Sequence, residues 1–457
     1  MRLKYLVFAV IWIAVALWMG QELFAEETAV IIGLKNPEGL SAQSIAQALG
    51  TKIQEQDGQI MRTYHLIDAL AAHLSEEALR ELSKDPSVRY IVPDGIVFTP
   101  ERLESSPELS TSELELTAIP VELYSWGVKR VKAPVVHRSA PPIDTSASIH
   151  PGTWGMILAL GLVGTLSVLR KNSQKFSLFL LLLVSTIGAL GGCTMVVVLP
   201  HPGILGEGIE VALLDTGVDL RHPDLRTNVL GGIDLVNDDD DPQDDNGHGT
   251  GVAGILAAAE NGQGLVGVAP KTGIWVVKML GENEQGSISD LIQGIEWAAE
   301  RGVKIISMSL GTTEDNAALH EAIRAAERAG ILLVAAAGNK GSQVLFPAAY
   351  PEVIAVAASD KNDQHAWFSN MGPEVELTAP GTDLLSTGLK GQYQSVNGTS
   401  FSVPHVTGVA ALLFSSGVSD SQEVRRRLDQ TAEDLGLAMT AQGYGLVDAE
   451  RAVLGRQ

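Results

Sequence analysis

Short apolar runs recur through the second half of the chain. They lie at residues 209–215, 273–280, 303–310, 330–338 and 353–359, and segments with helical periodicity alternate with them. Nearly continuous apolar runs of this length are typical of strands buried on both faces of a parallel sheet. From residue 206 onward we therefore predict an α/β domain with a doubly wound, mostly parallel sheet.

An earlier segment, residues 28–100, has the pattern of a small α+β domain. Apolar stretches at 28–34, 64–74 and 88–98 predict strands, and residues 41–50 and 75–86 predict helices. This order of elements predicts a ferredoxin-like unit. The residues that follow, 101–122, are rich in Ser, Glu and Pro, which is the composition of a solvated linker.

Three apolar segments belong to neither domain. Residues 5–20 follow Arg2 and Lys4 and predict a signal peptide or a signal anchor within residues 1–25. Residues 153–169 and 176–199 flank a basic connector and predict a transmembrane hairpin, within an insertion at 138–204. The positive connector is then cytoplasmic, and both domains lie outside the cytoplasm. The alternative interpretation is a pair of buried core helices.

Composition excludes several classes of protein. The 457 residues include 32 Lys and Arg against 54 Asp and Glu, giving a net charge of −22. This charge argues against a nucleic-acid partner, because such binding requires positive charge. A content of 45% hydrophobic and 19% charged residues excludes a mainly disordered chain. The single cysteine, Cys193, excludes an intrachain disulfide and a cysteine-cluster metal site, and it ends a stretch that resembles a bacterial lipidation site.

Three motifs place polar side chains where elements begin or end. Asp215 follows a buried strand, His248 opens one apolar helix and Ser400 opens another, each beside a glycine. A carboxylate can fix the tautomer of an imidazole, and the imidazole can then take the serine proton. Each motif alone also fits a turn or a helix cap. Together, in the order Asp, His, Ser, they predict a nucleophilic triad.

Residues 123–137 and 206–457 resemble the catalytic domain of the subtilisin-like serine proteases (subtilases, peptidase family S8). The motifs ALLDTGVD, NGHGT, SMSLG, AAAGN, NGTSFSVPHV and GYGLVDAERAV carry the resemblance. It implies a triad of Asp215, His248 and Ser400, with Asn339 as the side-chain donor to the oxyanion. Residues 28–100 are similar to the inhibitory pro-domain of the family, which occupies the active-site cleft. The catalytic domain then spans 123–457, interrupted by the insertion.

The resemblance also implies a cleft for protein or peptide substrates. The residues it assigns to that cleft are Ser309, Leu310, Gly311, Ala337, Gly338, Ile288, Leu291 and Lys340. Apolar walls at Ile288, Leu291 and Leu310 predict an apolar substrate residue at P4. Lys340 on the S1 rim predicts poor acceptance of a basic P1 residue, and Leu345 predicts a shallow S1 pocket. Gly251 departs from the histidine usual at its position.

Calcium is the predicted structural cofactor. The acidic run 237–245 fits either a solvated loop or a Ca²⁺ site, because Ca²⁺ takes several oxygen ligands. The resemblance to thermitase-like members implies a first set of ligands: Asp234, Asn237, Asp239, Asp241 and Gln243. A second family site implies Asp224 and Asn261, with Glu122 close by.

The sequence therefore predicts a serine endopeptidase that cleaves itself from a zymogen. It is tethered to the cell membrane and faces outward, or is secreted if maturation removes the hairpin; its partners are peptide substrates, its own pro-domain and membrane lipid. The alternative is a catalytically silent, membrane-anchored peptide-binding protein on the same fold.

Overall fold

The computed structural model describes residues 27–35, 42–55, 58–100, 122–138 and 203–455. Both runs of the predicted hairpin, the N-terminal apolar segment and the linker from residue 101 to 121 lie outside these residues. Within the described part of the chain, no helix has the length and apolar character needed to cross a membrane. The described residues up to His137 and from Ile204 onward belong to one compact unit.

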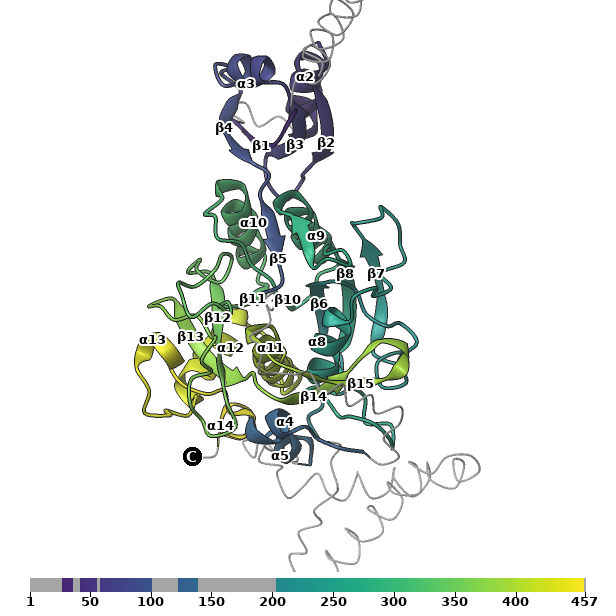
Figure 1. Cartoon of the computed structure of the whole chain (residues 1–457), viewed down its shortest axis with the longest axis vertical. Coiled ribbons are helices and arrows are strands. Elements are labelled where there is room, and N and C mark those ends of the chain that lie inside the picture. Colours follow the sequence, from purple (N-terminus) through teal and green to yellow (C-terminus); the bar gives the residue numbers. More distant parts are fainter. Residues whose placement is uncertain (1–26, 36–41, 56–57, 101–121, 139–202, 456–457) are drawn as a thin grey trace, which may run out of the picture. The chain divides into compact units, whose positions relative to one another are not determined.

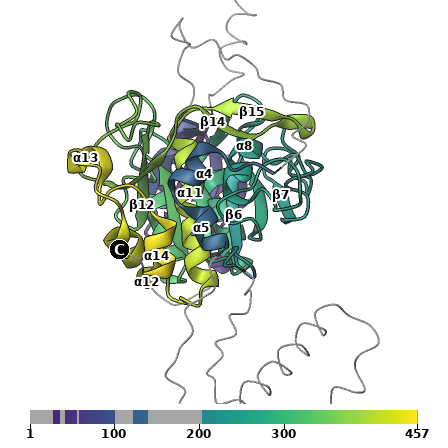
Figure 2. The ribbon, with the colours of Figure 1, turned by 90° about the horizontal axis from the view of Figure 1, so that it is seen from below.

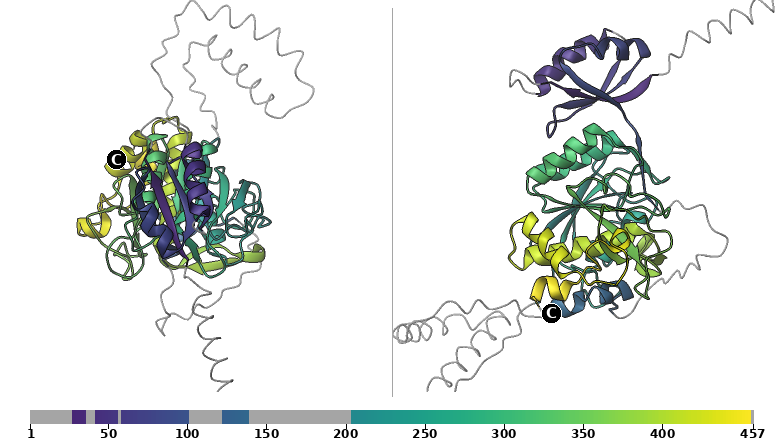
Figure 3. Two further views of the ribbon diagram at one scale, coloured as in Figure 1. Left: turned by 90° about the horizontal axis from the view of Figure 1, so that it is seen from above. Right: turned by 90° about the vertical axis from the view of Figure 1, so that its left-hand side faces the viewer.

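The pro-domain is a four-stranded antiparallel sheet covered by two helices on one face. Its elements are β1 (Thr28–Leu34), α2 (Ala42–Gln54), β2 (Gln59–Thr63), β3 (Ala69–Leu74), α3 (Glu76–Leu82) and β4 (Val88–Pro93). The strand order is β2-β3-β1-β4, and Figure 3 shows the two helices over the sheet. Ser75 caps α3, as predicted, by accepting a hydrogen bond from the backbone N–H of Ala78.

A seven-stranded parallel sheet forms the centre of the second domain (Figure 1). Its order is β13-β12-β11-β10-β6-β8-β7. The strands are β6 (Glu210–Asp215), β7 (Val229–Asp234), β8 (Gly273–Lys278), β10 (Ile305–Met308), β11 (Leu332–Ala336), β12 (Val353–Ser359) and β13 (Val375–Pro380). The predicted doubly wound parallel sheet is thereby confirmed. The chain reverses its direction of growth at β6, and ligands of such sheets bind at the carboxyl ends of strands beside this reversal.

Helices cover both faces of this sheet. One face packs on α8 (His248–Ala257), α11 (Thr399–Ser415), α12 (Ser421–Thr431) and α14 (Ala449–Leu454), and the other on α9 (Ile288–Glu300) and α10 (Ala317–Arg328). Strand β6 serves both cores, since Val211 and Leu213 face the first and Ala212 and Leu214 the second. This two-sided burial explains the uninterrupted apolar runs in the sequence.

Shorter elements complete the second domain. They are α4 (Trp126–Arg130), α5 (Ala133–His137), β9 (Gln285–Ser287), the hairpin of β14 (Leu384–Thr387) and β15 (Tyr393–Val396), and α13 (Met439–Gln442). Figure 2 shows α4 and α5 beside α14. Lys132, between α4 and α5, forms an ion pair of 2.5 Å with the buried Asp448 ahead of α14. The segment 122–137 is therefore part of this second domain.

The structure differs from the predicted pro-domain in three places. The predicted strand 64–74 begins only at Ala69, as β3, and residues 64–68 form a loop. Strand β2 was not predicted, because its sequence, QIMRT, lacks a clear apolar alternation. The predicted strand 88–98 is two strands: β4 ends at Pro93, which has no N–H for the ladder, and β5 (Ile96–Phe98) pairs instead with β9 of the catalytic domain. The pro-domain thus ends inside the catalytic domain, where β5 lies between α9 and α10 (Figure 1).

Candidate active site

Asp215 and His248 meet at the carboxyl end of β6. His248 Nδ1 lies 2.6 Å from Asp215 Oδ1, and Asp215 is fully buried. A β-carbon on Gly249 would lie only 2.1 Å from the carbonyl oxygen of Gly217, so glycine lets the start of α8 approach this strand end. Burial raises the pKa of the Asp215 carboxyl, and the bond to His248 opposes that shift.

Ser400 lies in the first turn of α11 and is fully buried. The ring of Phe401, the next residue, lies 5.2 Å from the ring of His248. Ser400 Oγ donates to the carbonyl oxygen of Ser309 at 3.2 Å. Gly398, with φ of 140°, precedes the helix and has no side chain with which to cap it, so a cap for the first N–H groups of α11 must come from another segment.

The side chain of Asn339 has a fixed orientation beside the same helix. Asn339 Oδ1 accepts from Thr399 N at 2.9 Å and from Thr399 Oγ1 at 2.7 Å. These two bonds determine which end of the amide carries the donors. Asn339 and Thr399 are both buried, so the arrangement is held in a site largely closed to water.

The end of the pro-domain, β5, adds a strand to β9 of the second domain. Val97 pairs with Gly286 of β9, and Phe98 exchanges two backbone hydrogen bonds with Gly311, of 3.0 and 2.9 Å. Val97 is fully buried in the same hydrophobic cluster as the three predicted S4 residues, Ile288, Leu291 and Leu310. The residues predicted to form apolar walls thus belong to the same buried cluster as an apolar side chain of β5.

Register locates the peptide bond nearest the candidate nucleophile. Because Phe98 opposes Gly311 in an antiparallel bridge, Pro100 falls opposite Ser309. The carbonyl oxygen of Ser309 is the group that accepts from Ser400 Oγ. Pro100 is therefore the residue beside Ser400, and the next bond, to Glu101, begins the linker.

The remaining predicted cleft residues line the same region. Lys340 is exposed, and its Nζ lies 5.9 Å from the ring centroid of Phe98, the last residue of β5. A β-carbon on Gly311 or on Gly338 would lie 3.0 Å from Leu345 Cδ1, which places Leu345 between these two segments. At Gly251 the corresponding space is occupied by Gln394 and Phe401.

Two buried charged residues that were not predicted contact the turns that carry Asp215 and His248. Asp244 accepts from Thr216 Oγ1 at 2.9 Å and from the backbone N–H of Gly247 at 2.9 Å, joining the Asp215 turn to the His248 turn. Lys278 Nζ donates to the carbonyl oxygen of Thr216 at 2.8 Å. The importance of Lys278 could have been inferred from the sequence, because it is the single charged residue in the apolar strand β8. Asp244 was interpreted as part of the acidic run.

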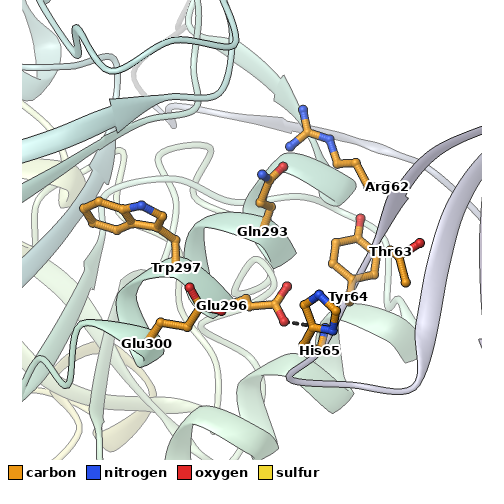
Figure 4. Close-up of a pocket in the computed structure, with 8 residues that line it drawn as sticks. All are labelled: Arg62, Thr63, Tyr64, His65, Gln293, Glu296, Trp297 and Glu300. Carbon is orange, nitrogen blue, oxygen red and sulfur yellow. Dashed lines mark hydrogen bonds between the residues drawn. The ribbon is translucent and has the colours of Figure 1, made fainter. Parts of the chain in front are cut away.

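The loop between β2 and β3 of the pro-domain contacts α9 directly. Glu296, on α9, accepts hydrogen bonds at one carboxylate oxygen from the backbone N–H groups of His65 and Leu66, the latter at 2.6 Å. These groups border a cavity of about 310 Å³ (Figure 4). The lining side chains are those of Arg62, Thr63, Tyr64, His65, Gln293, Glu296, Trp297 and Glu300. Burial raises the pKa of the Glu296 carboxyl, and the two backbone bonds oppose the shift.

The first predicted calcium loop is held by its own hydrogen bonds. Asp234 Oδ1 accepts from the backbone N–H groups of Val236 and Asn237, while Asp239 and Asp241 are exposed. Gln243 Oε1 accepts from the backbone of Leu220. No group of three or more His, Cys, Asp or Glu side chains that could hold a metal ion occurs in the described ranges.

Two carboxylates of the second predicted calcium site contact a single loop. Asp224 accepts from Leu265 N at 2.8 Å and from Asn261 Nδ2 at 3.2 Å, and Glu122 accepts from Gly262 N. Such oxygens are the ligands Ca²⁺ prefers, but the Asn261 amide presents its nitrogen rather than its oxygen to Asp224. Calcium stays a prediction at both sites.

Comparisons with known proteins identify the family of the chain. The profile of the Subtilase family matches residues 206–446, and that of Peptidase inhibitor I9 matches residues 31–100. A thermostable alkaline protease of Halalkalibacterium halodurans is 48% identical over 252 residues, which is 55% of this chain and 69% of the relative. Subtilisin E of Bacillus subtilis is 33% identical over 433 residues, which is 93% of this chain and 90% of the relative. The chain belongs to the subtilase family of serine endopeptidases and carries an I9 pro-domain.

Proposed function

We propose that Ser400 is the nucleophile of this endopeptidase, with His248 as its base and Asp215 as the group that orients His248. The observation that carries the proposal is the 2.6 Å bond between His248 Nδ1 and the buried Asp215. It directs the other ring nitrogen, Nε2, away from the carboxylate. Ser400, next to the Phe401 ring that contacts His248, is the hydroxyl that this nitrogen serves.

Proton transfers follow from this arrangement. His248 Nε2 takes the Ser400 Oγ proton as Oγ attacks the substrate carbonyl, and later gives it to the leaving amine. The Asp215 carboxylate stabilises the imidazolium without taking its proton. Asn339 and the backbone N–H of Ser400 donate to the oxyanion, and a side-chain donor of this kind contributes a factor of about 10²–10³ to kcat. Water then attacks the acyl group on Ser400 Oγ, with His248 acting as base again.

The chain is a zymogen that cuts itself at the start of its linker, 101–122. The register that sets Pro100 opposite Ser309 supports a first cut at the Pro100–Glu101 bond. The bound strand then occupies the cleft like a product, which explains how the pro-domain inhibits the enzyme until it dissociates.

We further propose that the enzyme is tethered to the membrane. The apolar runs 153–169 and 176–199, with the basic connector between them, support it. In a Cys193→Ser background, a thiol introduced by Ser173→Cys should resist a membrane-impermeant reagent added to intact cells and react after lysis. Labelling in intact cells would contradict the proposed topology.

A fluorophosphonate probe tests the triad against the alternative of a silent peptide-binding protein. Mature wild-type protein should be labelled covalently on Ser400. Ser400→Ala should not be labelled, whereas Ser415→Ala, a control in the last turn of the same helix, should be labelled as wild type. Equal labelling of Ser400→Ala and wild type would remove the assignment, and a wild-type protein that is not labelled would favour the silent alternative.

A further inference from the structure

Glu284 contacts Thr99, which directly follows the pro-domain strand β5. Thr99 Oγ1 donates to Glu284 Oε2 at 2.6 Å, and the Thr99 backbone N–H donates to the Glu284 carbonyl oxygen at 3.1 Å. Thr99 is fully buried. One residue of the catalytic domain thus binds both the backbone and the side chain of this position.

The Glu284 carboxylate is also held from the side of the catalytic histidine. Asn246 Nδ2 donates to Glu284 Oε1 at 3.2 Å and to the carbonyl oxygen of Glu282 at 3.0 Å. Asn246 Oδ1 accepts from the backbone N–H of His248 at 3.0 Å. Asn246 thus binds Glu284 Oε1 from within the catalytic domain, while Oε2 is the oxygen that accepts from Thr99, so Asn246 positions the carboxylate independently of the bound segment.

The strand register of the bound segment identifies which substrate residue would contact Glu284. Pro100 lies opposite Ser309, beside Ser400, so Thr99 is the second residue before the bond to be cut. A substrate that binds with the same backbone bonds places its own second residue against Glu284. A carboxylate can only accept hydrogen bonds and is negatively charged, so it distinguishes side chains by donors and charge.

We propose that Glu284 sets the enzyme's preference at this position, P2. It favours a hydroxyl or a cationic side chain over an apolar one of the same shape, and it disfavours an acidic side chain. The inference rests on the proposed function, because it assumes that substrates are cleaved at Ser400 in the register of the pro-domain.

The test uses four chromogenic peptides, Val-Phe-Xaa-Leu-p-nitroanilide, with Thr, Val, Lys or Asp as Xaa. Thr and Val have nearly the same shape, so their kcat/KM ratio isolates the hydroxyl. For the mature wild-type enzyme we expect a Thr to Val ratio of about tenfold, and a larger Lys to Asp ratio. Glu284→Gln should bring the Lys to Asp ratio close to one and reduce the Thr to Val ratio.

Glu282→Gln is the matched control. Its side chain is exposed two residues away, so the variant should keep the wild-type ratios. Ratios that are the same in wild type and Glu284→Gln, with the peptides cleaved, would overturn the inference and leave the proposed function intact. If wild type cleaves none of the peptides and is not labelled by the fluorophosphonate, the proposed function itself has failed.

Discussion

Ser309 Oγ donates a hydrogen bond of 2.7 Å to the carbonyl oxygen of Ser400. In a regular helix that carbonyl would accept from the residue four positions later, but this residue is Pro404, which has no N–H. The proline therefore leaves an acceptor that Ser309 occupies. Since Ser400 Oγ donates in turn to the Ser309 carbonyl oxygen, the strand end after β10 and the start of α11 are joined twice at the proposed nucleophile.

Ser309→Ala should lower kcat/KM by about two- to tenfold. The variant leaves the Ser400 carbonyl without its donor, and a hydrogen bond of this kind contributes about 0.5–1.5 kcal/mol. Steady-state kinetics on a peptide substrate measure the effect, with Ser415→Ala as the control on the same helix. An unchanged kcat/KM in a folded Ser309→Ala enzyme would show that the double contact has no role in positioning Ser400.

Pro100→Ala should speed the first cut about two- to tenfold. Proline at 100 cannot donate to the Ser309 carbonyl oxygen, whereas alanine has an N–H at that point of the ladder. The measurement is the time course of conversion of the full chain, followed by mass spectrometry. Slower conversion of Pro100→Ala would mean that the backbone bond at this position does not limit the cut.

Glu296→Ala should shorten the lag between the first cut and the appearance of activity. The variant removes the acceptor of two part-buried backbone N–H groups of the pro-domain, and each such hydrogen bond contributes about 0.5–1.5 kcal/mol. The cut pro-domain should then dissociate faster. Glu300→Ala is the control, because Glu300 borders the same cavity but is exposed. Equal lags for Glu296→Ala and wild type would contradict this role.

Asp429→Asn should stabilise the enzyme more at pH 9 than at pH 5. Burial, with the neighbouring Glu376, raises the pKa of the Asp429 carboxyl to about 8. The protonated carboxyl therefore raises the free energy of unfolding. This contribution is fully present below a pH of about 4 and is lost as the pH rises through 8. Asparagine stays neutral and avoids that loss. Thermal unfolding in a Ser400→Ala background, where autolysis is absent, measures the gain; an equal gain at both pH values would refute it.

Much of the catalytic domain could be predicted from the sequence, because its elements are buried strongly and uniformly. Strand β6 reads as apolar throughout since both of its faces are covered, and the positions of Asp215, His248 and Ser400 follow from the elements they end or begin. Strand β2 could not be predicted, because its residues are mixed in polarity and only partly buried.

Contacts between distant segments were also beyond the sequence. Glu284 and Glu296 are ordinary acidic residues until the pro-domain brings Thr99 and the backbone of Leu66 against them. The same holds for Asp244, whose neighbours in the sequence are solvated while its own carboxylate joins two turns. The role of each depends on a partner far away along the chain.

The fate of full-length Ser400→Ala tests the central claim most directly. Removing the nucleophile from a triad lowers kcat by about 10⁶, so this chain should accumulate with its pro-domain attached, while wild type converts under the same conditions. Intact mass and N-terminal sequencing of both proteins give the result. The account predicts a wild-type product beginning at Glu101 or within the linker and an uncut Ser400→Ala chain; conversion of purified Ser400→Ala at the wild-type rate would contradict it.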